Sequence, residues 1–284
     1  MSDEVKKVSG YKGYDGIYCS DVEGKLDRRI IKNKLKYEGS IFKTKCGIPC
    51  KVISYNTAKN IIIEFLDDYR YTTTVELGNL RKGNIRNPFS PSVRGVGYLG
   101  EGVFKSKENG VFTKEYIVWG SMFARCYSEV FHENNPTYKG CTVCKEWHNF
   151  QVFAKWYSEQ NHNHKDYVLD KDILFKGNKV YSPKNCRLVP HEINSLVNSS
   201  KNSELNLPTG VSFEKKSKRF RASLTVNGKS KYLGVYSTVS EAENVYKKEK
   251  HLYIKDSVLK WSGLVDEDII VSLIENWSYD GQCK

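Results

Sequence analysis

The residues best suited to chemistry lie in one stretch, residues 167–198. Four polar side chains there could bind a cation through oxygen: Asp170, Asp172, Asn185 and Asn194. Carboxylate and amide oxygens are the ligands that Mg²⁺ and Mn²⁺ prefer in proteins. The stretch therefore predicts a site for one divalent cation.

The elements that must position these side chains can be read from the same residues. Residues 167–174 are apolar and predict a strand, 175–179 form a Gly/Asn turn, and a second strand is expected after Ser182-Pro183. A short helix is expected over 191–198. The predicted unit is therefore ββα, and Asn194 on its helix lies nine residues after Asn185.

This unit resembles the HNH (ββα-metal) endonucleases of phages and mobile elements over about residues 97–198. The resemblance implies that Asp170 and Asn194 bind one Mg²⁺ or Mn²⁺, while Asn185 braces the loop. Lys171 stands where that family has its base histidine. Asp172 or His191 could replace the base, or a metal-bound water could react without one. The matching motifs are Leu169-Asp170-Lys171, Tyr181-Ser182-Pro183, Asn185-Cys186-Arg187 and Asn194, preceded by Trp119, Met122, Arg125-Cys126-Tyr127, Cys144 and Trp147.

Cysteine usage leaves two alternatives open. Cys141 and Cys144 have the C-x₂-C spacing of a zinc half-site, and Cys126 and Cys186 could complete a structural zinc site under the ββα unit. The rival is a set of buried reduced thiols. A disulfide framework is not expected in a long chain without secretory features.

The C-terminal part resembles the Apetala/ethylene-response type of DNA-binding domain over residues 208–255. Strands are expected at 209–213, 220–226 and 231–236, with an Asn227-Gly228 hairpin turn and helices at 240–254 and 266–277. The resemblance implies that the sheet binds double-stranded DNA. The predicted contact residues are all basic: Lys215, Lys216, Lys218, Arg219, Arg221, Lys229 and Lys231.

Composition supports a multidomain α+β protein that binds nucleic acid. The 284 residues carry a net charge of +12, and no apolar run or leader indicates a membrane or secretion, so a cytoplasmic location is expected, that of the host cell for a phage protein. A β-rich, Src-homology- or Tudor-like domain is expected over 1–90, led by residues 1–35. The HNH-like domain, with helices at 116–127 and 147–161, should span 91–200, and the Apetala-type domain with a closing helix 201–284.

Three functions remain open at this point. The first is a metal-dependent DNA endonuclease of the homing type. The second is a catalytically inactive DNA-binding regulator, or a phage inhibitor of a host defence protein. In a third, the N-terminal domain and the basic surface bind a protein partner.

Overall fold

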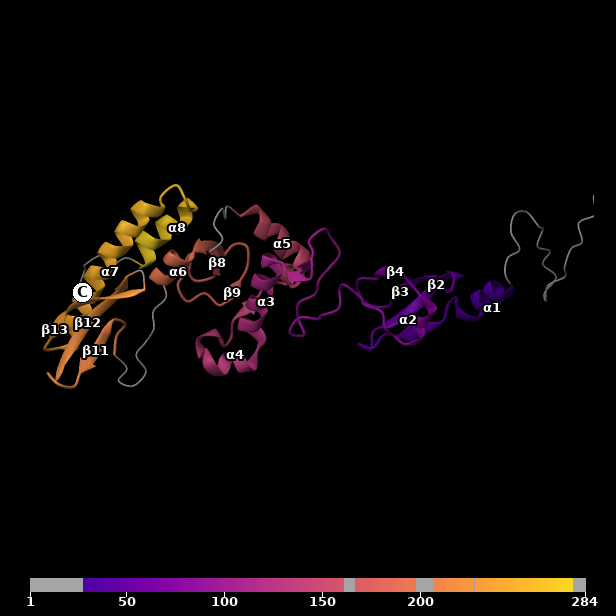
Figure 1. Ribbon diagram of the computed structural model, residues 1–284, viewed down its shortest axis with the longest axis horizontal. Helices are drawn as coiled ribbons and strands as arrows, with labels where there is room; N and C mark the ends of the chain where they lie inside the picture. The colour runs from indigo at the N-terminus through magenta and orange to yellow at the C-terminus, as the bar shows by residue number, and fades with distance from the viewer. Residues whose placement is uncertain (1–27, 161–166, 198–206, 227, 278–284) are drawn as a thin grey trace, which may run out of the picture. The chain divides into compact units, whose positions relative to one another are not determined.

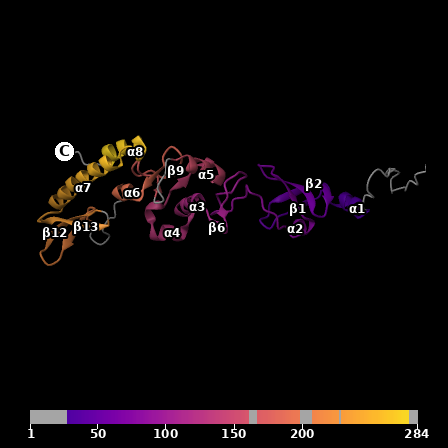
Figure 2. The same cartoon turned by 45° about the horizontal axis from the view of Figure 1, so that its top comes forward.

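The computed structural model describes residues 28–160, 167–197, 207–226 and 228–277. These residues form eight α-helices and several small sheets, which confirms the α+β class. The chain divides into two compact units, Met1–Phe89 and Ser90–Lys284 (Figure 1, Figure 2). No helix of the described residues is long and apolar enough to cross a membrane.

The first unit is a four-stranded antiparallel sheet covered by two short helices. The strands follow chain order: β1 (Ile41–Lys43), β2 (Pro49–Thr57), β3 (Asn60–Phe65) and β4 (Thr72–Val75). Alternate residues of β3, namely Ile61, Ile63 and Phe65, are buried, as the period of two predicts. Helices α1 (Arg28–Tyr37) and α2 (Leu77–Arg81) supply Tyr37 and Leu80 to this core. We expected a β-rich domain here and neither helix. The five residues of α2 are too few to show a helical period, and most of α1 lies in the lead segment 1–35, for which no element was expected.

An aromatic core joins the first elements of the second unit. Helices α3 (Lys114–Tyr127) and α5 (Phe150–Glu159) pack together, and the indole nitrogen of Trp119 donates to the carbonyl of Trp147 at 2.8 Å. The expected helix at 147–161 instead starts with a 3₁₀ turn, η2 (Lys145–His148), before α5 begins. The smaller elements are β5 (Lys107–Glu108), β6 (Val111–Phe112), α4 (Glu129–Asn134), η1 (Pro136–Tyr138), β7 (Thr142–Val143) and β9 (Val180–Tyr181).

The next elements follow the predicted order of strand, turn, strand and helix. They are β8 (Tyr167–Asp170), β10 (Arg187–Pro190) and α6 (His191–Val197), and β8 pairs antiparallel with β10. The first strand ends at Asp170 rather than at residue 174. The reason is that the Asp170 carboxylate accepts the backbone N–H groups of Asp172 and Ile173, which turns the chain out of the sheet.

A three-stranded sheet and two helices complete the chain. The strands β11 (Val211–Glu214), β12 (Arg219–Val226) and β13 (Lys229–Tyr236) are antiparallel, and Asn227 of the expected hairpin turn lies outside the described residues. Helix α7 (Val239–Trp261) begins with a capping box of Thr238 and Glu241. It runs seven residues past the predicted end at Ile254, because Val258 and Trp261 pack against the core that contains Ile173 and Ile269. Helix α8 (Glu267–Ser272) runs into the π-helical turn η3 (Leu273–Trp277).

Candidate functional site

Asp170 is a buried carboxylate that ends strand β8. Its Oδ1 atom accepts from the backbone nitrogens of Asp172 at 2.7 Å and Ile173 at 2.6 Å. Burial raises the pKa of this carboxyl, and the two N–H donors oppose the rise. One carboxylate oxygen is therefore already used in shaping the loop.

Lys171 is buried as well and is held by two oxygen atoms. Its Nζ donates to Oδ2 of Asp172 at 2.5 Å and to the carbonyl of Asn178 at 2.7 Å, and it lies 5.7 Å from the centre of the Tyr138 ring. Both partners are oxygen acceptors, so the Lys171 side chain holds the loop together as a hydrogen-bond donor.

Two asparagines tie the loop to strand β9. Asn185 donates from Nδ2 to Oδ1 of Asn178 at 3.1 Å and to the carbonyl of Val180 at 3.3 Å. Asn178 donates to the carbonyls of Lys171 and Val180, both at 2.8 Å. Asn178 was not among the predicted site residues. Its position after Gly177, which has φ 79°, is the turn signal that could have pointed to it.

Arg125 of helix α3 places a second cation near Asp170. Burial alone would lower the pKa of this guanidinium, but its hydrogen bond and charge interaction with Tyr181 and the nearby Asp170 carboxylate leave it raised. The sequence indicated Arg125 only as a residue of the matching motif. Its position near Asp170 could not be predicted from the sequence, because the two residues are 45 positions apart along the chain.

The two helical candidates lie on α6. His191 is exposed at its first position, and Asn194 is half-buried on the same helix. The hydrogen bonds found among the described residues join neither side chain to the Asp170 loop. Asp172 differs, because its Oδ1 atom is buried and has no hydrogen-bond partner in the part of the chain that the structure describes.

In the arrangement seen, cationic side chains of the protein itself lie beside the Asp170 loop. Within the described residues, no group of three or more His, Cys, Asp or Glu side chains is placed to hold a metal ion. The ammonium of Lys171 already pairs with Asp172, and Arg125 adds positive charge near Asp170. The unpaired Oδ1 of Asp172 is the one feature that suits a cation. Metal binding by Asp170 and Asn194 stays a prediction.

The four cysteines of the predicted zinc site lie in or beside the aromatic core. Cys126, Cys141 and Cys186 are buried free thiols, and Cys144 is half-buried. Burial raises the pKa of Cys126 to about 12 and that of Cys144 to about 11, and it also raises that of Cys186. Structural zinc likewise stays a prediction.

The basic strand β12 has one buried and one exposed face. Ala222 and Leu224 are buried, while Arg219, Arg221 and Thr225 are exposed. The ring of Tyr232, opposite Ser223 on β13, lies on the exposed face with its centre 5.5 Å from the Arg221 guanidinium. Three further predicted residues, Lys215, Lys216 and Lys218, are exposed in the turn before β12.

Two of the seven predicted contact residues lie on the helix side of the sheet. Lys231 is opposite the buried Leu224, and its ammonium pairs with Glu249 of α7. Lys229 is opposite Val226 on the same side. Successive strand residues point to opposite faces, so a run of basic residues in the sequence is split between the two.

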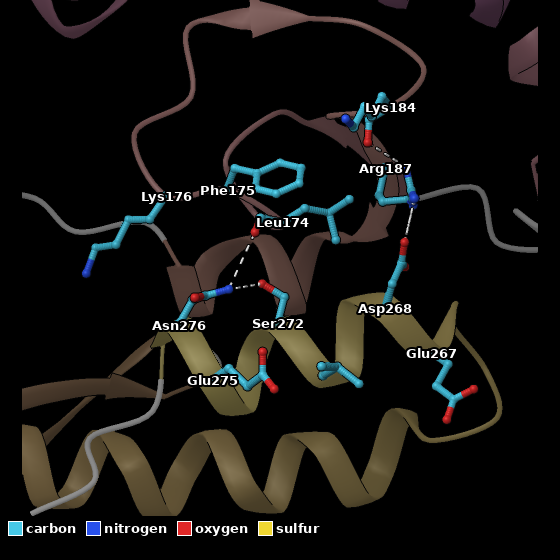
Figure 3. A pocket seen from close by; sticks show the side chains of 11 residues that line it. Leu174, Phe175, Lys176, Lys184, Arg187, Glu267, Asp268, Ser272, Glu275 and Asn276 are labelled. Carbon is cyan, nitrogen blue, oxygen red and sulfur yellow. Dashed lines mark hydrogen bonds and ion pairs between the residues drawn. The ribbon is translucent and has the colours of Figure 1, made fainter.

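Helix α8 and the turn η3 also form hydrogen bonds with the ββα unit. Arg187 donates to Oδ2 of Asp268 from Nε at 3.0 Å and from Nη2 at 2.5 Å. Asn276 donates to the carbonyl of Leu174, and Ser272 donates to that of Ile173. Figure 3 shows these side chains around an open groove of about 1050 Å³ between the loop and α8. Beneath it, Ile173, Val189 and Ile193 share a core with Ile254, Ile269 and Leu273.

Comparison with protein-family models, with curated proteins and with solved structures finds no match to this chain.

Proposed function

We propose that this chain binds double-stranded DNA through the exposed face of the β11–β13 sheet and the turn before β12. The observation that carries the proposal is the gathering of five exposed cations on that turn and face, with Glu214 as the acid beside them. Glu214 accepts from Arg221 at 2.5 Å and from Ser217 at 2.7 Å, which leaves four of the five cations for phosphates. The five are Lys215, Lys216, Lys218, Arg219 and Arg221.

The same face carries groups that suit base edges. Arg221 and Tyr232 lie together, and Ser223 and Thr225 add hydroxyl groups along β12. An antiparallel sheet is narrow enough to enter the major groove, where Arg can bind guanine and a methyl or ring can contact thymine. Lys229 and Lys231 lie on the other side, so we leave them out of the proposed contact set.

The position of the charges suggests a direct test. The variant Lys216→Gln/Arg219→Gln should lower the affinity for a duplex and make the slope of log K against log salt shallower by about 1.8, for two phosphate contacts. Lys229→Gln/Lys231→Gln removes the same charge from the helix side and is the matched control. Fluorescence anisotropy with a labelled duplex measures both. An equal loss in the two variants would show that the exposed face is not the contact surface.

Cleavage of the bound DNA by the ββα unit is our second proposal. It is favoured by the buried, unpaired Oδ1 of Asp172 beside Asp170 and by the resemblance to HNH endonucleases. A divalent cation would supply charge stabilisation at the phosphate. Among this chain's residues, Asp170 and Asn194 would hold the cation, as the resemblance implies, and Asp172 would add an oxygen atom through its unpaired Oδ1.

A plasmid-nicking assay in Mg²⁺ and in Mn²⁺ tests this second proposal. Nicking that is lost in Asp170→Asn and Asn194→Ala supports an endonuclease. Tight binding without nicking in either metal supports the DNA-binding regulator. Failure of the chain to bind DNA at all would favour the protein-partner alternatives, including inhibition of a host defence protein.

The finer domain layout belongs to this proposal as well. We infer an N-terminal Src-homology- or Tudor-like domain over 1–90, an HNH-like domain over 91–200 and an Apetala-type domain over 201–284. The shared core of Ile173, Ile193 and Ile254 supports treating the last two as one DNA-binding body. In that body, the sheet would bind at a fixed distance from the ββα unit.

A further inference from the structure

The described part of the first unit, residues 28–89, is strongly basic, as the C-terminal sheet is. Residues 28–89 contain thirteen Lys and Arg against five Asp and Glu, a net charge of +8. The whole chain carries +12. A segment of about one fifth of the length therefore supplies two thirds of the net charge, and the proposed function does not use it.

Four exposed cations of this unit lie on neighbouring segments at the ends of α1 and α2 and in the β1–β2 turn. We call them the α1–α2 cluster: Lys36, Lys45, Arg81 and Lys82. Lys36 lies 5.4 Å and Arg81 5.6 Å from the centre of the Tyr37 ring. The Arg81 guanidinium also donates to the hydroxyl of Tyr37. Both cations are thus positioned on one buried side chain at the end of α1.

Backbone contacts place Lys45 and Lys82 on neighbouring segments. The nitrogen of Lys45 donates to the carbonyl of Gly83 at 2.8 Å, which places the β1–β2 turn against the end of α2. Gly83 has φ 63°, and a Cβ there would lie 2.7 Å from the carbonyl oxygen of Lys43. Lys82 directly precedes this glycine. Only glycine allows so close an approach, so the contact is built into the fold.

Three of the five acids in residues 28–89 have partners outside the α1–α2 cluster. Glu38 accepts from the backbone nitrogen of Tyr55, and Glu64 pairs with Arg70 at 3.6 Å. Asp67 accepts from Asn87 at 2.6 Å. None of the ion pairs found between described residues includes a member of the α1–α2 cluster. The phenol of Tyr37 accepts a hydrogen bond from Arg81, and this bond lowers the pKa of Tyr37 although burial acts to raise it.

We propose that the α1–α2 cluster is a second nucleic-acid contact surface that binds the phosphodiester backbone. Its four cations offer ammonium and guanidinium donors, which suit phosphate and carry no base readout. A duplex presents a charge about every 1.7 Å along its axis, so closely spaced cations all find a phosphate. The choice of a nucleic acid over an acidic protein rests on the proposed function. A polymer is a partner that both basic surfaces of one chain can bind at once, with the gain in affinity that linkage brings.

The test uses the full chain and a labelled 30-base-pair duplex of arbitrary sequence. Lys45→Gln/Lys82→Gln removes two cluster charges and spares Arg81, which holds Tyr37. The control Lys51→Gln/Lys59→Gln removes two exposed charges from β2 and the β2–β3 turn. We expect the cluster variant to make the salt slope shallower by about 1.8 and the control to leave it unchanged. Equal changes in both variants, or no change in either, would overturn the proposal.

A third arm separates this proposal from that for the C-terminal sheet. The Lys216→Gln/Arg219→Gln variant is measured alone and together with the cluster variant. If the sheet does not bind DNA, the Lys216→Gln/Arg219→Gln variant binds the duplex as the wild type does, while the cluster variant still loses affinity. If only the cluster proposal fails, the Lys216→Gln/Arg219→Gln variant loses affinity and the cluster variant does not. Polyglutamate serves as a probe for an acidic protein. If the cluster variant lost binding to polyglutamate but bound the duplex as the wild type does, the partner would be an acidic protein and the proposal would be overturned.

Discussion

The Lys171–Asp172 pair provides the sharpest prediction, because it decides whether the ββα loop is held by an internal cation. We consider Lys171→Met, which keeps the apolar part of the side chain and removes the ammonium. The change leaves the Asp172 carboxylate and the Asn178 carbonyl without their donor. Removing one partner of a buried ion pair costs about 3–5 kcal/mol. The Asp172 side chain is 33% exposed, so solvent screening reduces the expected loss to about 2–3 kcal/mol.

Tryptophan fluorescence during urea unfolding measures this loss selectively. All five tryptophans lie after residue 89, so the signal reports the second unit and not the first. The control is Lys155→Met, which removes an exposed helical cation paired with Glu159 at 4.0 Å and should cost less than about 0.5 kcal/mol. Adding Asp172→Leu to Lys171→Met removes the stranded carboxylate and should recover part of the stability.

Two results would refute this reasoning. A loss below about 1 kcal/mol for Lys171→Met would mean that the ammonium does not hold the loop. A clear rise in the melting temperature of the wild type with millimolar Mg²⁺ or Mn²⁺, lost in Asp170→Asn, would mean that a metal ion is bound at this place in the native protein.

Four further predictions concern other contacts. Asp170→Asn keeps an oxygen for the N–H groups of Asp172 and Ile173 and should be tolerated, whereas Asp170→Ala should cost about 2 kcal/mol in urea unfolding. Because the folded pKa of Asp170 is raised, the native state binds its proton more tightly. The Asp170 carboxyl therefore adds to the free energy of unfolding at low pH, and this contribution is lost as pH rises through its folded pKa. Asp170→Asn should flatten this part of the curve of unfolding free energy against pH. An unchanged curve would contradict the prediction. Arg187→Met should loosen the clasp on Asp268 and speed amide hydrogen exchange in α8, while an unaltered exchange rate would show that the shared apolar core suffices. Gly83→Ala should destabilise the first unit by more than about 1 kcal/mol, seen by tyrosine circular dichroism, and Gly47→Ala, also at positive φ but in open space, should cost less.

The order of elements could be predicted from the sequence because local patterns fix it. The alternation in β3, the Gly/Asn turn after β8 and the apolar spacing in α3 each depend on neighbouring residues. The α+β class follows from those same patterns. Element ends were less accurate, and β8 ended early because a side chain, Asp170, takes hydrogen bonds that the strand would have needed.

The arrangement of the candidate site was decided by the tertiary structure. Asp170 and Lys171 were identified from the sequence, but their partners Asn178 and Arg125 were not, because a loop and a distant helix bring them there. The split of the basic run, which turns Lys231 toward Glu249, depends on strand register and on the bulge after Ala222.

The sequence alone therefore determined which residues are charged, apolar or turn-forming, and with them the elements and the basic character. Only the tertiary structure decided which charges meet. Lys171 is held by Asp172, whereas the cations around Tyr37 converge without a described acidic partner. The physical reason is that propensity acts between near neighbours, while charge pairing acts across space between residues whose separation in the sequence carries no signal.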